Sequence, residues 1–194
     1  MNVFRGDERM FIIMNKTRNI VLAALLTALS MVITFSPLKL PVPQPFSVTL
    51  ASHTPTMIAM FINPWVALFT VIGSCLGFWI ATGNIIVVIR AASHIVFALA
   101  GVLMLKKGHA NIFVTIVVTS VLHAVAEGLI VYGLTPLFFP EKTVNLLLMY
   151  TTTIGTLFHH YVDTIITAPI LYALTKAKLV HTNVFVKKNK SVNA

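Results

Sequence analysis

Long apolar stretches alternate along the chain with short polar or proline-rich breaks. Six apolar segments can be drawn, covering about 17–36, 48–62, 64–82, 85–105, 111–134 and 145–175. Backbone N–H and C=O groups in lipid must bond within their own segment, so each of the six is predicted to be a helix. The second segment is short and contains Pro55, whereas the sixth is longer than one span and is expected to tilt or to extend beyond the bilayer.

Composition supports a membrane location for these helices. Hydrophobic residues make up 57% of the chain and charged residues only 10%, against roughly 25% charged residues in soluble domains. The mean hydropathy is +0.90. This number of charges is too small to cover the surface of a soluble protein of this size. The predicted fold class is therefore an all-α integral membrane bundle with six transmembrane helices. Cys75 is the single cysteine, which excludes an intramolecular disulfide.

The distribution of basic residues predicts the orientation of the bundle. With six spans, one side of the membrane carries Arg5, Arg9, Lys16, Arg18, Lys106, Lys107, Lys176, Lys178, Lys187, Lys188 and Lys190, and the other side carries Lys39 and Lys142. The positive-inside rule then places both termini in the cytoplasm. The same rule explains the net charge of +9 without nucleic acid as a partner. We divide the chain into a polar N-terminal extension (1–15), a six-helix membrane domain (16–178) and a basic cytoplasmic tail (179–194), with either Met1 or Met14 as the start.

Two outside connections are rich in proline and phenylalanine. They read "SPLKLPVPQPFSV" after the first segment and "TPLFFPEKTVN" after the fifth. The four prolines of the first prevent it from being a helix interior, and the second is also bounded by proline and carries two phenylalanines. Structured loops on one face often act as lids, and ordinary linkers are the equally weighted alternative.

Charged and histidine side chains recur at helical spacing inside the later segments. Arg90 and His94, His123 and Glu127, and His159 and Asp163 are each four residues apart, and residues at this spacing share a helix face. A charged side chain at mid-bilayer costs roughly 2.5–3.5 kcal/mol on insertion scales, so such residues usually face the bundle interior and usually serve function. We predict a substrate cavity in the outer half of the membrane, open to the outside, formed by Arg90, His94, His53, His123, Glu127, His160, Asp163 and Asn84. The alternative is that these groups only pair internally, Arg90 with Glu127 or Asp163.

Motif spacing argues against catalysis. The chain has no HExxH, no Walker motif and no GxSxG. His123 with Glu127 and His159 with Asp163 have metal-ligand spacing, but a cation would be repelled by Arg90. We therefore predict no enzyme activity, no metal and no cofactor. A stand-alone proton-coupled transporter remains an alternative, because carboxylate–histidine chains relay protons, although the chain shows no inverted repeat.

The first segment reads "NIVLAALLTALSMVITF", in which Ala24 and Ala28 form an AxxxA pair. Small residues at this spacing let another helix approach closely. Together with the chain length, the predicted topology and the stretch "SHTPTMIAMFINPWVALFTVIGSCLGFW" (52–79), the sequence resembles the substrate-binding S components of energy-coupling factor (ECF) vitamin transporters. The resemblance covers 16–178.

The resemblance implies a binding subunit of a prokaryotic plasma membrane. It implies capture of a small vitamin from outside, and uptake driven by an ECF scaffold subunit and two ATPase subunits. It also implies that Ala24 and Ala28 dock on the scaffold. Arg90 favours an anionic vitamin because guanidinium pairs with carboxylates. Pantothenate is preferred over niacin, because the late segments offer hydroxyls (Ser93, Thr152, Thr153, Thr156) and no tryptophan for a pyridine ring.

Overall fold

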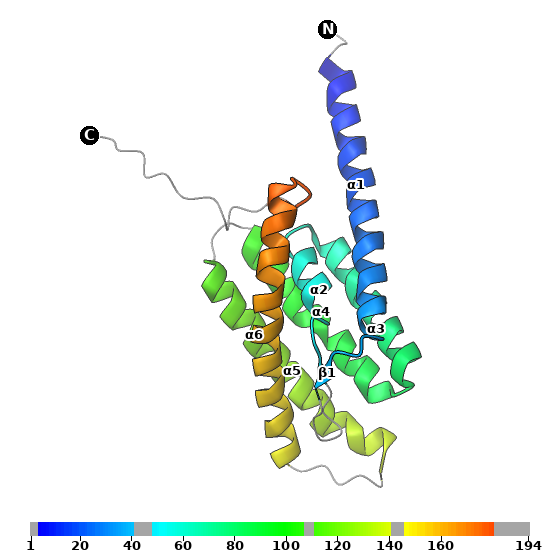
Figure 1. The fold of residues 1–194 in the computed structure, drawn as a ribbon, viewed down its shortest axis with the longest axis vertical. Helices are drawn as coiled ribbons and strands as arrows, with labels where there is room; N and C mark the ends of the chain where they lie inside the picture. Colours follow the sequence, from blue (N-terminus) through cyan, green and yellow to red (C-terminus); the bar gives the residue numbers. More distant parts are fainter. Residues whose placement is uncertain (1–3, 41–47, 107–110, 141–145, 181–194) are drawn as a thin grey trace, which may run out of the picture.

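The protein is a helical bundle with a small hairpin at one side (Figure 1). The computed structural model describes residues 4–40, 48–106, 111–140 and 146–180, and the statements below concern these ranges. The elements in chain order are α1 (Phe4–Ile33), β1 (Lys39–Leu40), β2 (Val48–Thr49), α2 (Thr54–Ala59), α3 (Pro64–Thr82), α4 (Ile85–Lys106), α5 (Ile112–Phe138) and α6 (Leu146–Lys176). β1 and β2 pair antiparallel, with Lys39 opposite Thr49.

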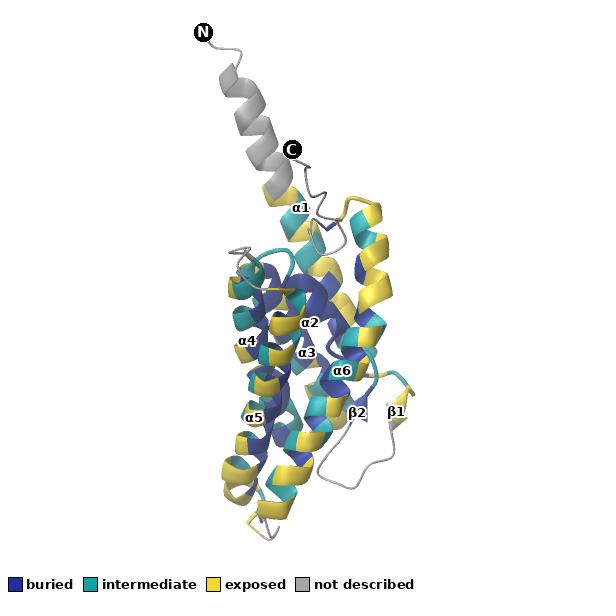
Figure 2. Cartoon of the chain, turned by 90° about the vertical axis from the view of Figure 1, so that its left-hand side faces the viewer, coloured by how far each residue is buried: buried dark blue, intermediate teal, exposed yellow. Residues whose placement is uncertain are grey.

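The helices pack largely in chain order around a short central helix. α3 packs against α4, α4 against α5, and α5 against α6, while α1 lies outside this set against α3. α2 contacts α1, α3, α4 and α6, and Figure 2 shows it as a buried element among the longer helices. The core therefore forms around α2, and the segment that leads into α2 enters the bundle interior.

Helices α5 and α6 are largely polar on their inner face and apolar on their outer face. In α5 the buried positions recur every four residues as Thr115, Thr119, His123, Glu127, Val131 and Thr135. Its exposed positions carry large apolar side chains, namely Phe113, Val114, Val117, Val121, Val125 and Leu129. Lipid solvates apolar side chains and cannot hydrogen-bond, so this arrangement suits a bilayer and not water. The polar stripes predicted from sequence are confirmed as inward-facing.

Four of the described helices are long and apolar enough to cross a membrane: α1 (from Lys16), α3, α4 and α5. α6 has 31 residues and carries the polar stripe of Thr152, Thr156, His159, His160, Asp163 and Thr167. The chain is thus an all-helical, multi-pass membrane protein, and the predicted count of six spans is not confirmed.

The prediction of a second membrane-length helix over 48–62 is wrong. α2 has six residues, a rise of roughly 9 Å at 1.5 Å per residue, against a hydrocarbon core of ~30 Å. Residues 52–60 are all buried, so protein and not lipid surrounds this non-spanning segment. Irregular backbone at membrane depth is tolerated in such surroundings, because neighbouring helices supply its hydrogen-bond partners.

The boundaries of α3 follow the sequence signals, whereas α1 and α5 extend beyond their predicted limits. α3 begins after Asn63, whose side chain accepts a hydrogen bond from the Val66 N–H at 3.0 Å, and it has Pro64 in its first turn. Gly83 ends it with φ +61°, a left-handed conformation suited to glycine. α1 begins at Phe4, well before the predicted 17, and α5 continues through Pro136 to Phe138.

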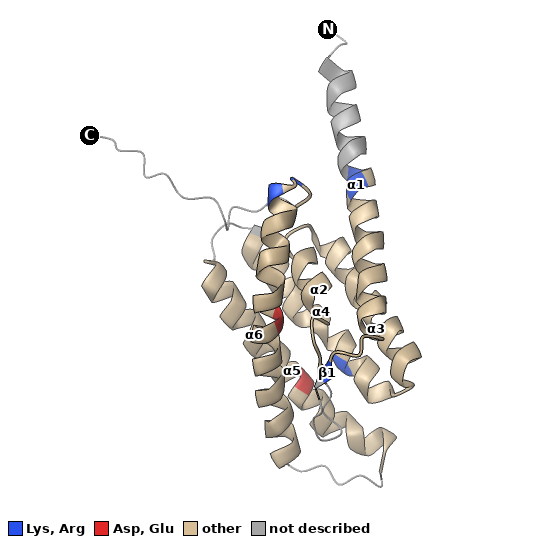
Figure 3. Ribbon diagram, viewed as in Figure 1, with Lys and Arg blue, Asp and Glu red and all other residues tan. Residues whose placement is uncertain are grey.

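The beginning of α1 and the end of α6 lie at the same end of the bundle (Figure 1). Arg18 of α1 donates to the Leu179 carbonyl just after α6, and Figure 3 shows basic residues of both helices gathered at this end. This agrees with the predicted clustering of positive charge. The tail from 181 onward and the side chains of 4–15 lie outside the described residues, so the proposed domain limits at 15 and 179 remain predictions.

Glycines in α3 allow α1 to approach closely. Ser30 of α1 donates to the Thr70 carbonyl at 2.9 Å. A methyl group added at Gly77 would stand 2.8 Å from Cα and 2.9 Å from the carbonyl oxygen of Met31. The neighbouring atoms are backbone, which cannot move aside as a flexible side chain can.

We expect Gly77→Ala to destabilise the protein by about 1–3 kcal/mol, the usual cost of overpacking. The measurement is the thermal unfolding midpoint in detergent. Gly133→Ala in α5 is the matched control, because an added methyl group there meets nothing within 4 Å. An equal or higher midpoint for Gly77→Ala relative to Gly133→Ala would show that the α1–α3 contact is not tight.

Candidate functional site

The carboxylate of Asp163 in α6 binds the chain segment that leads into α2. Its Oδ1 accepts the Ala51 N–H at 2.7 Å, and its Oδ2 accepts the His53 N–H at 2.9 Å. The ring Nδ1 of His53 lies 2.8 Å from Oδ2. Because a carboxylate only accepts, Nδ1 carries the proton. Ala51 has φ +65°, an uncommon conformation for a residue with a Cβ. Asp163 thereby fixes both the backbone and the His53 side chain.

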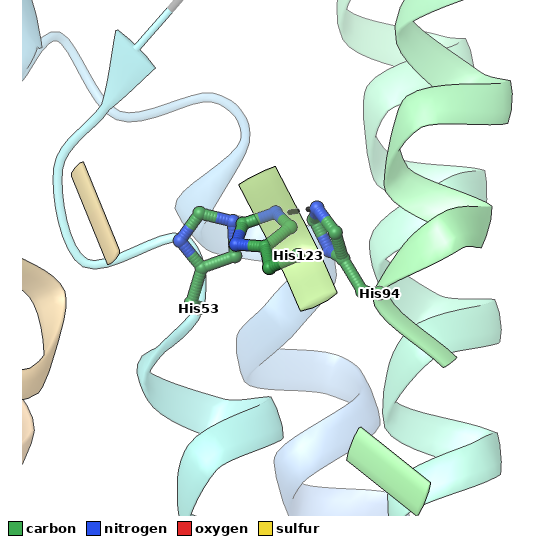
Figure 4. Close-up of side chains that lie close together, drawn as sticks. All are labelled: His53, His94 and His123. Atoms are coloured by element: carbon green, nitrogen blue, oxygen red, sulfur yellow. Dashed lines mark hydrogen bonds between the residues drawn. The ribbon is translucent and has the colours of Figure 1, made fainter. Parts of the chain in front are cut away.

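His53 is held at the centre of a group of five buried histidines. The ring centroid of His53 lies 4.5 Å from that of His123 in α5. It lies 4.6 Å from those of His94 in α4 and His159 in α6. His160 lies further away, at 6.2 Å. Figure 4 shows His53, His94 and His123 turned toward one another from three different elements. Sequence spacing predicted the stripes on α4, α5 and α6, and the structure brings them to a common point.

Arg90 of α4 pairs with Glu127 of α5. Nη2 and Nε of Arg90 donate to Oε2 of Glu127 at 2.7 and 3.2 Å, and both side chains are buried. Thr156 of α6 donates to the same oxygen at 2.6 Å. The sequence left Glu127 and Asp163 as possible partners of Arg90. The structure pairs Arg90 with Glu127, while Asp163 binds the segment before α2.

A small polar cavity lies between the Asp163-bound segment and helices α3–α6. It has a volume of about 20 Å³ and is lined by Thr49, Ser52, His53, Phe78, Val87, Arg90, Ala91, His94, Glu127 and His159. Its wall combines a guanidinium, histidines and hydroxyls with one aromatic ring, Phe78 of α3. This cavity offers groups for an anion and a face for a planar ring.

The structure separates the predicted site residues into three sets. Arg90, His94, His53 and Glu127 line the polar cavity, and His123 and Asp163 contact its lining side chains. His160 instead lines a second, mainly apolar cavity of about 90 Å³ between α2, α4, α5 and α6. Asn84 accepts the Ile86 N–H at 3.0 Å at the start of α4, and among the described residues it is not part of either cavity wall.

Six residues of the cavity wall were missing from the predicted site: Thr49, Ser52, Phe78, Val87, Ala91 and His159. His159 shares the spacing signal of Asp163, and its Nε2 lies 3.2 Å from the Thr49 carbonyl oxygen. The others carry no sequence signal of their own. Thr49 and Ser52 reach the site only because the segment before α2 enters the bundle, and Phe78 only because α3 packs against α4.

Comparison with known proteins identifies a relative. The niacin transporter NiaX of Lactococcus lactis subsp. cremoris is 35% identical to this chain over 159 residues, which is 76% of this chain and 70% of NiaX. No family model matches the sequence, and no solved structure matches it.

Replacing Asp163 with Asn is expected to release the segment before α2. An amide keeps one acceptor oxygen and presents an NH₂ group to one of the two backbone N–H donors, so a buried donor is left without an acceptor at a cost of about 1–3 kcal/mol. The measurement is hydrogen exchange of the peptide containing 49–54, which we expect to accelerate.

Thr175→Val is the matched control on α6, because the Thr175 hydroxyl donates only locally, to the Leu171 carbonyl at 2.8 Å. Its exchange over 49–54 should equal that of the unmodified protein. Unchanged exchange in Asp163→Asn would contradict the anchoring role of this carboxylate.

Proposed function

The chain belongs to the niacin branch of the ECF S components, the family of NiaX, and we propose that it captures niacin from outside the cell for ATP-driven uptake. The identity to NiaX carries this proposal. The family is one of transporters and not of enzymes. Niacin was the alternative to pantothenate in the sequence-based prediction, and the pantothenate preference finds no support in the comparison.

The polar cavity suits a pyridine carboxylate. The argument for pantothenate was that the late helices lack an aromatic wall, but α3 supplies Phe78 to the same cavity as Arg90. Arginine binds carboxylates through paired, charge-assisted hydrogen bonds. In the proposed complex the niacin carboxylate meets Arg90 and the ring lies against Phe78, with the hydroxyls of Thr49 and Ser52 beside it.

The cavity has to enlarge before niacin can enter. A volume of about 20 Å³ holds about one water molecule, far less than an aromatic ring with its carboxylate. Thr49, Ser52 and His53 all belong to the segment held by Asp163. We propose that this segment moves outward to admit the vitamin and closes over it again.

The AxxxA face of α1 is the proposed docking surface for an ECF scaffold subunit, which acts with two ATPase subunits. Ala24 and Ala28 are exposed, and α1 packs against α3 and α2 through its other side. Val21, Leu25 and Leu29 beside the alanines are also exposed, giving an apolar surface with small residues at its centre. The cytoplasmic position of both termini and a prokaryotic plasma membrane belong to the same proposal.

Purified protein is expected to bind niacin without ATP, and the double variant Arg90→Gln/Glu127→Gln to lose at least about 10–100-fold in affinity. Changing both residues avoids leaving one buried charge without its partner. The measurement is titration calorimetry with nicotinic acid, with nicotinamide and pantothenate as competing ligands. Nicotinic acid should bind most tightly, since only it combines a pyridine ring with a carboxylate.

Arg18→Gln is the matched control, because it removes a guanidinium at the end of the bundle where α1 meets the residues after α6. It should bind niacin as the unmodified protein does. Full niacin affinity in a folded double variant would exclude Arg90 as the carboxylate partner, and tighter binding of pantothenate would reverse the choice of vitamin.

Ala24→Trp and Ala28→Trp are each expected to abolish uptake while leaving niacin binding unchanged, since a bulky ring keeps the scaffold helix at a distance. Uptake is measured in vesicles holding this protein with the scaffold and ATPase subunits. Ala92→Trp, at an exposed alanine of α4, is the matched control and should transport normally. Normal uptake by both α1 variants would exclude this docking face, and pH-driven uptake by the protein alone would favour the proton-coupled alternative.

A further inference from the structure

We propose that His53, His94, His123 and Glu127 form a binding site for one divalent transition-metal ion, with Zn²⁺ the best match to its ligands. One ring nitrogen from each of the three histidines lies within 4.8 Å of the other two, and all three residues are buried. Three imidazoles and one carboxylate are a ligand set that tetrahedral Zn²⁺ accepts. This site goes beyond vitamin binding and does not depend on it.

Three of the distances among these atoms match those around a tetrahedral ion. Nε2 of His53 is 3.3 Å from Nε2 of His94. Oε1 of Glu127 is 3.4 Å from Nε2 of His94 and 3.4 Å from Nε2 of His123. Ligand atoms about 2.0–2.1 Å from a tetrahedral ion stand roughly 3.3–3.4 Å apart. The ring planes are inclined to one another by 68°, 72° and 89°, a T-shaped packing in which no two rings stack face to face (Figure 4).

Surrounding hydrogen bonds point the correct atoms at the common centre. Asp163 accepts from Nδ1 of His53, which leaves Nε2 of a neutral ring with its lone pair toward His94. Nδ1 of His123 lies 3.1 Å from Nδ1 of His160, so its Nε2 is turned to Glu127. Arg90 and Thr156 bind Oε2 of Glu127 and leave Oε1 facing the histidines. Carboxylates and other groups behind metal-ligating histidines orient them in this way.

Hydrogen bonding alone accounts poorly for the centre of this cluster. Nε2 of His123 is buried and makes no hydrogen bond to any described residue, although it lies 3.4 Å from Oε1 of Glu127. Nε2 of His94 lies 3.3 Å from Nε2 of His53 and 3.4 Å from Oε1 of Glu127, so a single N–H at this position has two acceptors to serve. A cation between these atoms satisfies all of them at once, whereas an unsatisfied buried nitrogen is costly.

The sequence argued against a metal site because Arg90 would repel a cation. The geometry weakens this argument. Arg90 contacts Oε2 of Glu127, on the opposite side of the carboxylate from the histidines. With neutral histidines, Arg90, Glu127 and Asp163 sum to one negative charge. His53, His159 and Asp163 form a competing group, but both oxygens of Asp163 already accept backbone N–H groups.

The experiment uses the full chain purified in detergent through an affinity tag without histidine. The protein is stripped with a chelator and titrated with Zn²⁺ and with Co²⁺, and bound metal is counted by mass spectrometry. We expect about one ion per chain, the intense visible absorption of tetrahedral Co²⁺, and a higher thermal unfolding midpoint on reloading. His123→Gln should lower the metal affinity by at least about 100-fold, while His159→Gln should retain the metal.

Absence of stoichiometric binding by the stripped and reloaded unmodified protein would overturn the metal site, and this measurement needs no variant to fold. Loss of metal in His159→Gln with retention in His123→Gln would also overturn it, in favour of the group around Asp163. Niacin affinity is measured on the same preparations. Protein that binds niacin but takes up no metal on reloading would refute this inference alone, and protein that takes up metal but binds no niacin would refute the proposed vitamin alone.

Discussion

The hydrogen bonds between the Asp163 carboxylate and the segment before α2 determine the rest of the site. They join residues 110 and 112 positions apart in the chain and satisfy backbone groups that would otherwise lie unbonded inside the bundle. They also set the direction of His53. Without this anchor the N–H groups of Ala51 and His53 would lose their acceptor, and Thr49, Ser52 and His53 would no longer be held in the wall of the polar cavity.

Glu127 of α5 joins Arg90 of α4 and Thr156 of α6, so one carboxylate holds three helices together where lipid offers no hydrogen bonds. The site is therefore closed, with Arg90 already paired in the absence of ligand. A niacin carboxylate has to share Arg90 with Glu127 or to displace Glu127 from it. The free energy of niacin binding then compensates for the cost of opening the segment.

Vitamin and metal sites fit the same architecture without competing for the same atoms. The proposed metal ligands are ring nitrogens and Oε1 of Glu127, whereas the proposed vitamin ligand is Arg90 with Phe78 as its neighbour. An ion at the histidines would tie the segment before α2 to α4 and α5 through His53, His94 and His123. A divalent ion would change the net charge of the cluster from one negative to one positive charge. A net positive charge favours an anion beside it.

The sequence by itself determined the helical membrane class, the limits of α3 and α4, and the polar stripes, because apolar length and four-residue spacing are local properties of the chain. It placed Arg90, His94, His123, Glu127 and Asp163 on inward faces for the same reason. Only the tertiary structure decided that 48–62 is a buried segment with a six-residue helix, that Glu127 is the partner of Arg90, and that Phe78 belongs to the cavity. These depend on contacts between distant segments, which side-chain spacing within one helix does not encode.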